Sequence, residues 1–86
     1  MYTLEIEEEV FKAFKKLSKK DRKHLEALNK KIEQILNDPF QFKPLKQPLA
    51  GLRRVHVGSF VLIYEVLENQ RTVRILKHEH HDQAYQ

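Results

Sequence analysis

The chain contains no cysteine and no tryptophan, and it has only two glycines and three prolines among its 86 residues. The lack of cysteine excludes disulfide bonds and thiolate chemistry and is compatible with the cytoplasm, where we expect the protein to act. No apolar run approaches the roughly 20 residues that cross a bilayer, so we expect no membrane partner. The acidic N-terminus is unlike a secretory signal. With 41% hydrophobic and 33% charged residues, residues 1–86 are expected to form a single globular domain.

Acidic residues are also missing from the middle of the chain, between Asp38 and Glu65. The basic residues in that gap are Lys43, Lys46, Arg53 and Arg54. A stretch of one charge sign attracts polyanions over the roughly 8–10 Å that cellular salt leaves unscreened. We predict that Lys43, Lys46 and Arg53 bind RNA, while the alternative is that this charge only aids solubility.

The first half of the chain has the periodicity of helices after one short alternating segment. Residues 2–6 alternate and predict a strand, and residues 7–17 predict a helix with three glutamates at its positive end. A second helix is expected to begin at the capping-box-like run S-K-K-D (18–21) and to end before Pro39. Two amphipathic helices with a short link predict an antiparallel helical hairpin.

The second half is rich in Val, Ile, Leu and Tyr and predicts three strands, over residues 52–57, 60–67 and 71–77. Gly58-Ser59 has the form of a two-residue hairpin loop, and Asn69-Gln70 is expected to close the second hairpin. The fold class that follows is α+β, with an N-terminal helical hairpin packed on a small, mainly antiparallel twisted sheet. The N-terminal strand is added to that sheet, and residues 40–51 form an irregular connection.

Counting outward from the two loops predicts the strand register. Glu65 then lies opposite Arg74, an opposite-charge pair that supports the count. The same count places both His56 and His78 opposite Val61. Because side chains alternate between the faces of a sheet, one face should pack on the helices and the other should be more polar. The polar face would carry Arg54, His56, Val61, Ile63, Leu76 and His78, with His80 after them.

A metal site is one chemistry open to the histidines, since three of the chain's five fall within residues 78–81. His78 and His80 could bind zinc together, with His56 or Asp82 as a third ligand. The pattern His-x-His-His is a weak signal, however, because no Cys or His pair stands at zinc-finger spacing. We therefore expect neither a metal nor another cofactor.

Acid–base cleavage of RNA is the second chemistry. Cleavage through the 2′-hydroxyl of RNA needs a base for that proton, an acid for the leaving 5′-oxygen, and cations for the phosphorane. Imidazole can take either proton role and guanidinium supplies a fixed charge. The candidate catalytic residues are His56, His80, His81, Tyr85 and Arg54. The simpler alternative is an inert, solvated tail.

Four segments together resemble a known family. They are F-K-A-F-K-K-L-S-K-K-D-R-K (11–23), N-D-P-F-Q-F-K-P-L-K (37–46), L-A-G-L-R-R-V-H-V-G-S-F-V-L-I-Y-E-V (49–66) and V-R-I-L-K-H-E-H-H-D-Q-A-Y (73–85). The chain resembles the RelE/ParE superfamily of toxins from toxin–antitoxin pairs, which implies a microbial-RNase-like fold. RelE-like members cleave mRNA in the ribosomal A site without a metal, whereas ParE-like members inhibit DNA gyrase. The resemblance also implies a cognate RelB-like antitoxin.

The resemblance extends to part of the family's nuclease pattern. In the family stretch Arg-x-Arg-x-Gly-x-Tyr-Arg, this chain keeps the first arginine and the glycine and replaces the other three. The corresponding residues are Arg54, His56, Gly58, Phe60 and Val61. The family tail His-Arg-x-x-Val-Tyr becomes H-H-D-Q-A-Y (80–85).

The resemblance therefore implies a ribosome-dependent, metal-independent endoribonuclease. His80 or His81 would be its acid, and His56 or Tyr85 would handle the proton of the 2′-hydroxyl. A gyrase-inhibiting toxin without nuclease activity and a catalytically weakened member are the alternatives.

Overall fold

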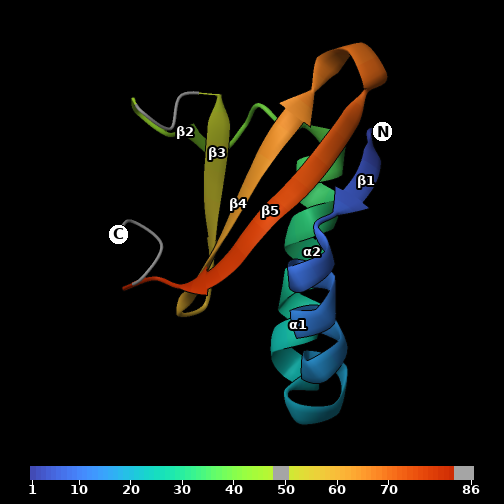
Figure 1. The fold of residues 1–86 in the computed structure, drawn as a ribbon, viewed down its shortest axis with the longest axis vertical. Coiled ribbons are helices and arrows are strands. Elements are labelled where there is room, and N and C mark those ends of the chain that lie inside the picture. Colours follow the sequence, from blue (N-terminus) through green and yellow to red (C-terminus); the bar gives the residue numbers. More distant parts are fainter. Residues whose placement is uncertain (48–50, 83–86) are drawn as a thin grey trace.

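The computed structural model describes residues 1–47 and 51–82, and these form the predicted α+β fold (Figure 1). The elements are β1 (Thr3–Ile6), α1 (Glu8–Lys20), α2 (Arg22–Asn37), β2 (Lys43–Pro44), β3 (Leu52–Val57), β4 (Phe60–Leu67) and β5 (Thr72–His80). A short 3-10 turn, Glu68–Gln70, joins β4 to β5. The strand order is β1-β5-β4-β3-β2, with β1 parallel to β5 and the other neighbours antiparallel. No helix in the described part of the chain is long and apolar enough to cross a membrane.

The two helices form the predicted antiparallel hairpin, but their junction lies later than expected. Ser18 stays inside α1, where its hydroxyl donates a hydrogen bond to the carbonyl oxygen of Lys15 at 2.6 Å. Asp21 is the N-cap of α2 and accepts a hydrogen bond from the backbone N–H of His24 at 3.1 Å. The prediction that α2 begins at residue 18 was therefore wrong. The reason is that a serine can bond back to its own helix, which leaves capping to the aspartate.

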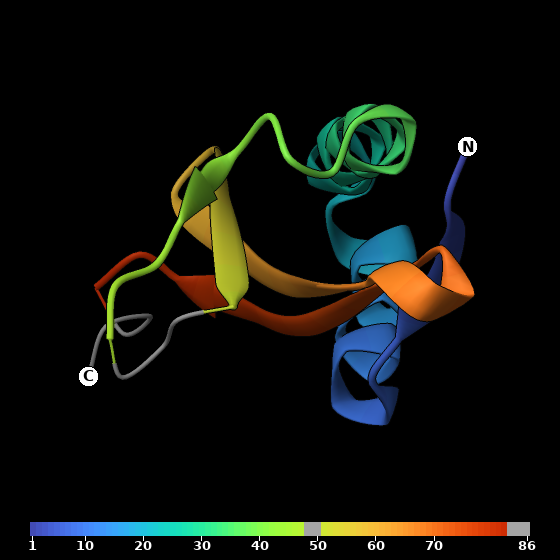
Figure 2. The same ribbon diagram turned by 90° about the horizontal axis from the view of Figure 1, so that it is seen from above.

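The core lies between the helical hairpin and one face of the sheet, as predicted. The helices bury Val10, Phe14, Leu28, Ile32 and Ile35, and the strands bury Val55, Val57, Leu62, Tyr64, Val73 and Ile75. Seen from above (Figure 2), β2 and the end of β5 lie on the opposite side of the molecule from α1. The sheet therefore extends beyond the helical layer on the side that carries β2, β3 and the end of β5.

A buried hydroxyl ties this core to the end of α2. Tyr64 is completely buried, and its hydroxyl donates a hydrogen bond to the carbonyl oxygen of Pro39 at 2.6 Å. Burial raises the pKa of Tyr64 to about 12. The phenol therefore stays protonated and keeps donating at any physiological pH.

Tyr64→Phe is expected to lower the free energy of unfolding by about 1–2 kcal/mol, because the Pro39 carbonyl would lose its donor in a buried position. Urea denaturation measures the loss. Tyr2→Phe is the matched control, since it removes a hydroxyl that bonds Glu68 near the surface, and it should cost at most about 0.5 kcal/mol. Equal losses for the two variants would contradict this account.

Candidate active site at the end of the sheet

The β3–β4 hairpin has the predicted register. Val57 pairs with Phe60 and His56 pairs with Val61, so the loop is Gly58-Ser59. Gly58 has a positive φ of 61°, a conformation that glycine adopts without strain. Because Val55 and Val57 point into the core, Arg54 and His56 lie on the face away from the helices.

The β4–β5 pairing begins as predicted and then slips by one residue. Glu65 pairs with Arg74 and Tyr64 with Ile75, but Ile63 pairs with Lys77, which makes Leu76 an extra residue in β5. The side-chain carboxylate of Glu65 lies 3.6 Å from the guanidinium of Arg74.

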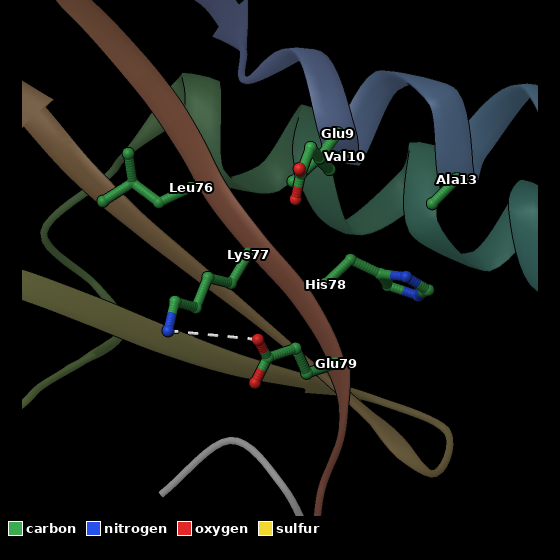
Figure 3. A pocket seen from close by; sticks show the side chains of 7 residues that line it. All are labelled: Glu9, Val10, Ala13, Leu76, Lys77, His78 and Glu79. Carbon is green, nitrogen blue, oxygen red and sulfur yellow. Dashed lines mark ion pairs between the residues drawn. The ribbon is translucent and has the colours of Figure 1, made fainter. Parts of the chain in front are cut away.

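This bulge overturns the predicted placement of His78 and His80. One inserted residue reverses the alternation of every residue that follows it. His78 therefore lies opposite Leu62 and His80 opposite Phe60, both on the helix-facing side. Figure 3 shows His78 on one side of β5 and Lys77 and Glu79 on the other. The predicted gathering of His56, His78 and His80 on one face was wrong.

The bulge instead brings His81 to His56. Their ring centroids are 5.9 Å apart, and both side chains are exposed. The backbone N–H of His81 donates to the carbonyl oxygen of Ser59 at 3.0 Å, which holds the end of β5 against the hairpin loop. Two imidazoles thus lie close together at the end of the sheet, tilted by 47° to each other, on the side that carries Arg54.

Asp82 lies between the two last histidines. Its Oδ1 is 3.2 Å from Nδ1 of His81, and its Oδ2 is 3.7 Å from Nδ1 of His80. A carboxylate at Nδ1 favours the proton on that nitrogen and leaves Nε2 of His81 for proton transfer. His80 lies instead against the edge of the Phe60 ring, with centroids 5.6 Å apart. Of the two predicted acids, His81 is the one that the geometry places beside His56.

Basic residues continue this face along β2 and β3. Lys43, Lys46 and Arg54 line a hollow of about 270 Å³, together with Pro44 and Leu45. Lys43 pairs with Arg54 across the β2–β3 ladder. Lys43 and Lys46, two of the three residues predicted to bind RNA, therefore lie with Arg54 on the face that carries the His56–His81 pair.

Arg53, the neighbour of Arg54, is held by other contacts. Its Nη1 donates to the carbonyl oxygens of Phe40 at 3.3 Å and Phe42 at 2.7 Å, and its guanidinium lies 5.1 Å from the Phe40 ring centroid. These contacts fix the segment that leads into β2. Its predicted contact with RNA stays a prediction.

Beneath this face lies a second, smaller apolar cluster. Val61 and Ile63 are buried there against Leu45 and Leu52. Both faces of β4 are therefore covered. Val61 has no exposed surface, and it supports the backbone opposite His56 without adding charge to the site.

Sequence reasoning missed His24, which forms a second histidine pair. Its Nε2 lies 3.1 Å from Nε2 of His78, between α2 and β5. Burial, and then the neighbouring His24, lower the pKa of His78 to about 4. The bulge that turns His78 inward carries no glycine or proline, so the sequence offers no signal for this contact.

The described residues do not gather a metal site. Within residues 1–47 and 51–82, no group of three or more His, Asp or Glu side chains is placed to hold a metal ion. Tyr85, the remaining predicted catalytic residue, lies outside the described residues.

Residues 2–85 match one protein family, described as "ParE toxin of type II toxin-antitoxin system, parDE". The chain is also similar to a curated archaeal protein from Methanocaldococcus jannaschii, described as "Putative toxin RelE4". The two are 44% identical over 86 residues, which cover 99% of this chain and 92% of that protein.

Solved structures with the same fold include toxins. One is the crystal structure of the toxin–antitoxin complex RelBE2 from Mycobacterium tuberculosis, with a TM-score of 0.77 and 26% identity over 92% of this chain and 96% of that one. Another is the YoeB/ParE toxin from Agrobacterium tumefaciens, with a TM-score of 0.82 and 18% identity over 92% of this chain and 98% of that one.

Proposed function

This chain belongs to the ParE toxin family of type II toxin–antitoxin systems, within the RelE/ParE superfamily, and we propose that it is a ribosome-dependent endoribonuclease of the RelE-like kind. It cleaves mRNA in the cytoplasm by attack of the 2′-hydroxyl, without a metal. The observation that carries the proposal is the pair of exposed imidazoles, His56 and His81, whose ring centroids are 5.9 Å apart beside the basic hollow.

The proposed mechanism divides the proton transfers between these two rings. His56 takes the proton of the 2′-hydroxyl, the 2′-oxygen bonds to phosphorus, and the bond from phosphorus to the 5′-oxygen breaks. His81 gives its proton to that leaving oxygen, so the products are a 2′,3′-cyclic phosphate and a 5′-hydroxyl. Because the attacking and leaving oxygens lie on opposite sides of the phosphorus, the base and the acid must flank a phosphate. The neighbouring rings of His56 and His81 are the proposed base and acid on the two sides of that phosphate.

The other proposed residues stabilise the negative charge of the RNA or assist the proton transfers. Arg54 stabilises the phosphorane, while Lys43 and Lys46 hold neighbouring phosphates of mRNA or ribosomal RNA. Asp82 accepts the hydrogen bond of the His81 Nδ1–H, so the proton that the doubly protonated ring gives away is the one on Nε2. Tyr85 remains a candidate for the proton of the 2′-hydroxyl, and His80 remains a candidate acid that the geometry favours less.

A second function, inhibition of gyrase by binding alone, is favoured by one observation. Val61 stands where the superfamily's nuclease pattern has an arginine, and it is buried with no exposed surface. Loss of that guanidinium removes a fixed charge from the phosphate site. The exposed histidine pair argues against this second function, because a toxin that acts by binding alone does not need titratable groups.

Purified protein incubated with translating ribosomes separates these functions. We expect cleaved mRNA with 2′,3′-cyclic phosphate ends, also when the toxin alone is treated with EDTA and desalted before it meets the ribosomes, and we expect no inhibition in a gyrase supercoiling assay. Intact mRNA together with blocked supercoiling would reverse the assignment. Intact mRNA and normal supercoiling would leave only the weakened nuclease.

We further propose that a RelB-like antitoxin silences the toxin. Because the site face carries Lys43, Lys46 and Arg54, the antitoxin segment that covers it should be acidic. Co-expression of the neighbouring open reading frame should restore growth to cells that are arrested by this chain. Growth arrest that persists with a co-purifying partner would contradict this proposal.

A further inference from the structure

The strongest unassigned feature is the contact between His24 of α2 and His78 of β5. Their Nε2 atoms are 3.1 Å apart and their ring centroids 5.3 Å apart. The centroid distance is close to the sum of the Nε2–Nε2 distance and the two ring radii, so the rings meet head-on. A hydrogen bond between the two Nε2 atoms fits this geometry, whereas a shared metal ion does not, because each metal–nitrogen bond is about 2.0–2.1 Å long.

This pair joins the helical layer to the end of the sheet. The ring of His78 is stacked on Phe60, with centroids 4.6 Å apart and an interplanar angle of 7°, and it meets the edge of Phe14 of α1 at 5.5 Å. The His24 ring reaches the hairpin loop, where a Cβ added to Gly58 would lie 3.9 Å from its Nδ1. Three residues after His78 comes His81 of the candidate site.

The hydrogen bond limits how many protons the pair can hold. It needs one ring with a proton on Nε2 and one ring with a bare Nε2. A first added proton goes to Nδ1 of the donor ring and leaves the bond intact. A second must go to the accepting Nε2, after which two donors and two positive charges face each other at 3.1 Å. The bond is then lost.

His78 is the ring that resists the second charge. It is half-buried, and the lowering of its pKa to about 4 has burial as the larger cause and His24 as the other. When the pair holds one added proton, His78 is thus the ring that stays neutral and accepts the hydrogen bond.

Charged groups surround the pair without bonding to it. Glu9 of α1, with Lys77 and Glu79 of β5, lines a hollow of about 230 Å³ beside His78 (Figure 3), and Asp21 caps the helix at His24. Lys77 and Glu79 pair with each other at 3.9 Å. The β4 neighbours of His78 carry no charge. Among the described residues, no carboxylate lies within ion-pair distance of the His24 or His78 ring.

We propose that the His24–His78 hydrogen bond positions the end of β5, and with it His81, and that acid releases this contact by protonating both rings. His24 and His78 are then positioning residues, which touch neither RNA nor the reacting atoms. The positioning of β5 and its release by acid do not depend on the function proposed above. Only the effect of this contact on RNA cleavage rests on that proposed function.

The first test compares the pH dependence of stability in wild type and His78→Gln. The glutamine keeps an acceptor for His24 but cannot be protonated. Since the pKa of His78 is lower when folded than the ordinary value near 6.5, its contribution to stability is present above pH 6.5 and is lost as the pH falls to about 4. Over that range the unfolding equilibrium constant of the wild type should rise at least about tenfold more than that of His78→Gln.

His56→Gln is the matched control for this test, because it removes an exposed histidine from the other face. It should keep the wild-type acid response. A parallel response of wild type and His78→Gln would overturn the proposal. A second measurement uses the wild-type protein alone. The ¹⁵N spectra of the two rings at neutral pH should show one ring protonated on Nε2 and the other on Nδ1. The same tautomer in both rings would overturn the proposal as well.

Positioning itself is tested by hydrogen exchange at the His81 amide, which bonds to Ser59. Between pH 6.5 and 4, its protection factor should fall at least about tenfold in wild type and stay level in His78→Gln. Unchanged protection in wild type would overturn the positioning role. Absence of RNA cleavage at every pH, with this exchange pattern present, would count against the proposed function alone.

Discussion

Replacing His81 with alanine is expected to lower the rate of mRNA cleavage about 10²–10⁴-fold, the usual contribution of a positioned general acid. His56→Ala should cause a loss in the same range, because it removes the proposed base. Both side chains are exposed, so neither variant should change the free energy of unfolding by more than about 0.5 kcal/mol. Single-turnover cleavage on stalled ribosomes measures the effect on the chemical step.

The double variant and a neighbouring histidine sharpen this test. If the two rings act on one phosphate, His56→Ala with His81→Ala should be little worse than either single variant, since residues that act as a unit are non-additive. His80→Ala is the matched control, as it removes the adjacent ring on the opposite side of β5. A larger loss for His80→Ala than for His81→Ala would reassign the acid and break the proposed geometry.

The part of the site in β3 and β4 was predictable, because a turn determines it. Gly58-Ser59 admits one short loop, and the alternation on either side then places Arg54 and His56. The pairing of Glu65 with Arg74 followed from the second loop in the same way, although that loop is a 3-10 turn followed by Arg71 in the left-handed conformation.

The end of β5 was not predictable, and the reason lies in the apolar residues around Leu76. The hydrophobic pattern of a strand determines its register where one face of the sheet is buried and the other is exposed to solvent. Here both faces of β4 are buried, with Leu62 toward the helices and Val61 and Ile63 toward Leu45 and Leu52. Leu76 can then be inserted at little cost, because the polar ring that the slip turns inward, His78, finds a hydrogen-bond partner in His24. The sequence carries no mark of the slip. Every face assignment after it was reversed.

The second large effect on mRNA cleavage is expected at Arg54, one of two adjacent arginines in β3. Arg54→Ala is expected to slow mRNA cleavage about 10²–10³-fold, the usual cost of removing one group that stabilises transition-state charge. Arg54→Lys should recover only part of the rate, because an ammonium cannot bind phosphate in the bidentate manner of guanidinium. The measurement is again single-turnover cleavage, now repeated at several salt concentrations to separate binding from chemistry.

Arg53→Ala is the control, and it tests whether the alternation of side chains between the two faces of β3 keeps Arg53 away from the RNA. Its guanidinium donates to Phe40 and Phe42, so its loss should lower the free energy of unfolding by about 1–3 kcal/mol. Cleavage per folded molecule should change little, in contrast to Arg54→Ala. If Arg53→Ala slows cleavage as strongly as Arg54→Ala does, then Arg53 contacts RNA, as its charge predicts. RNA would in that case contact both faces of β3. Opposite outcomes at two neighbouring positions would instead mean that the face of β3, more than its charge, decides which guanidinium reaches the phosphate.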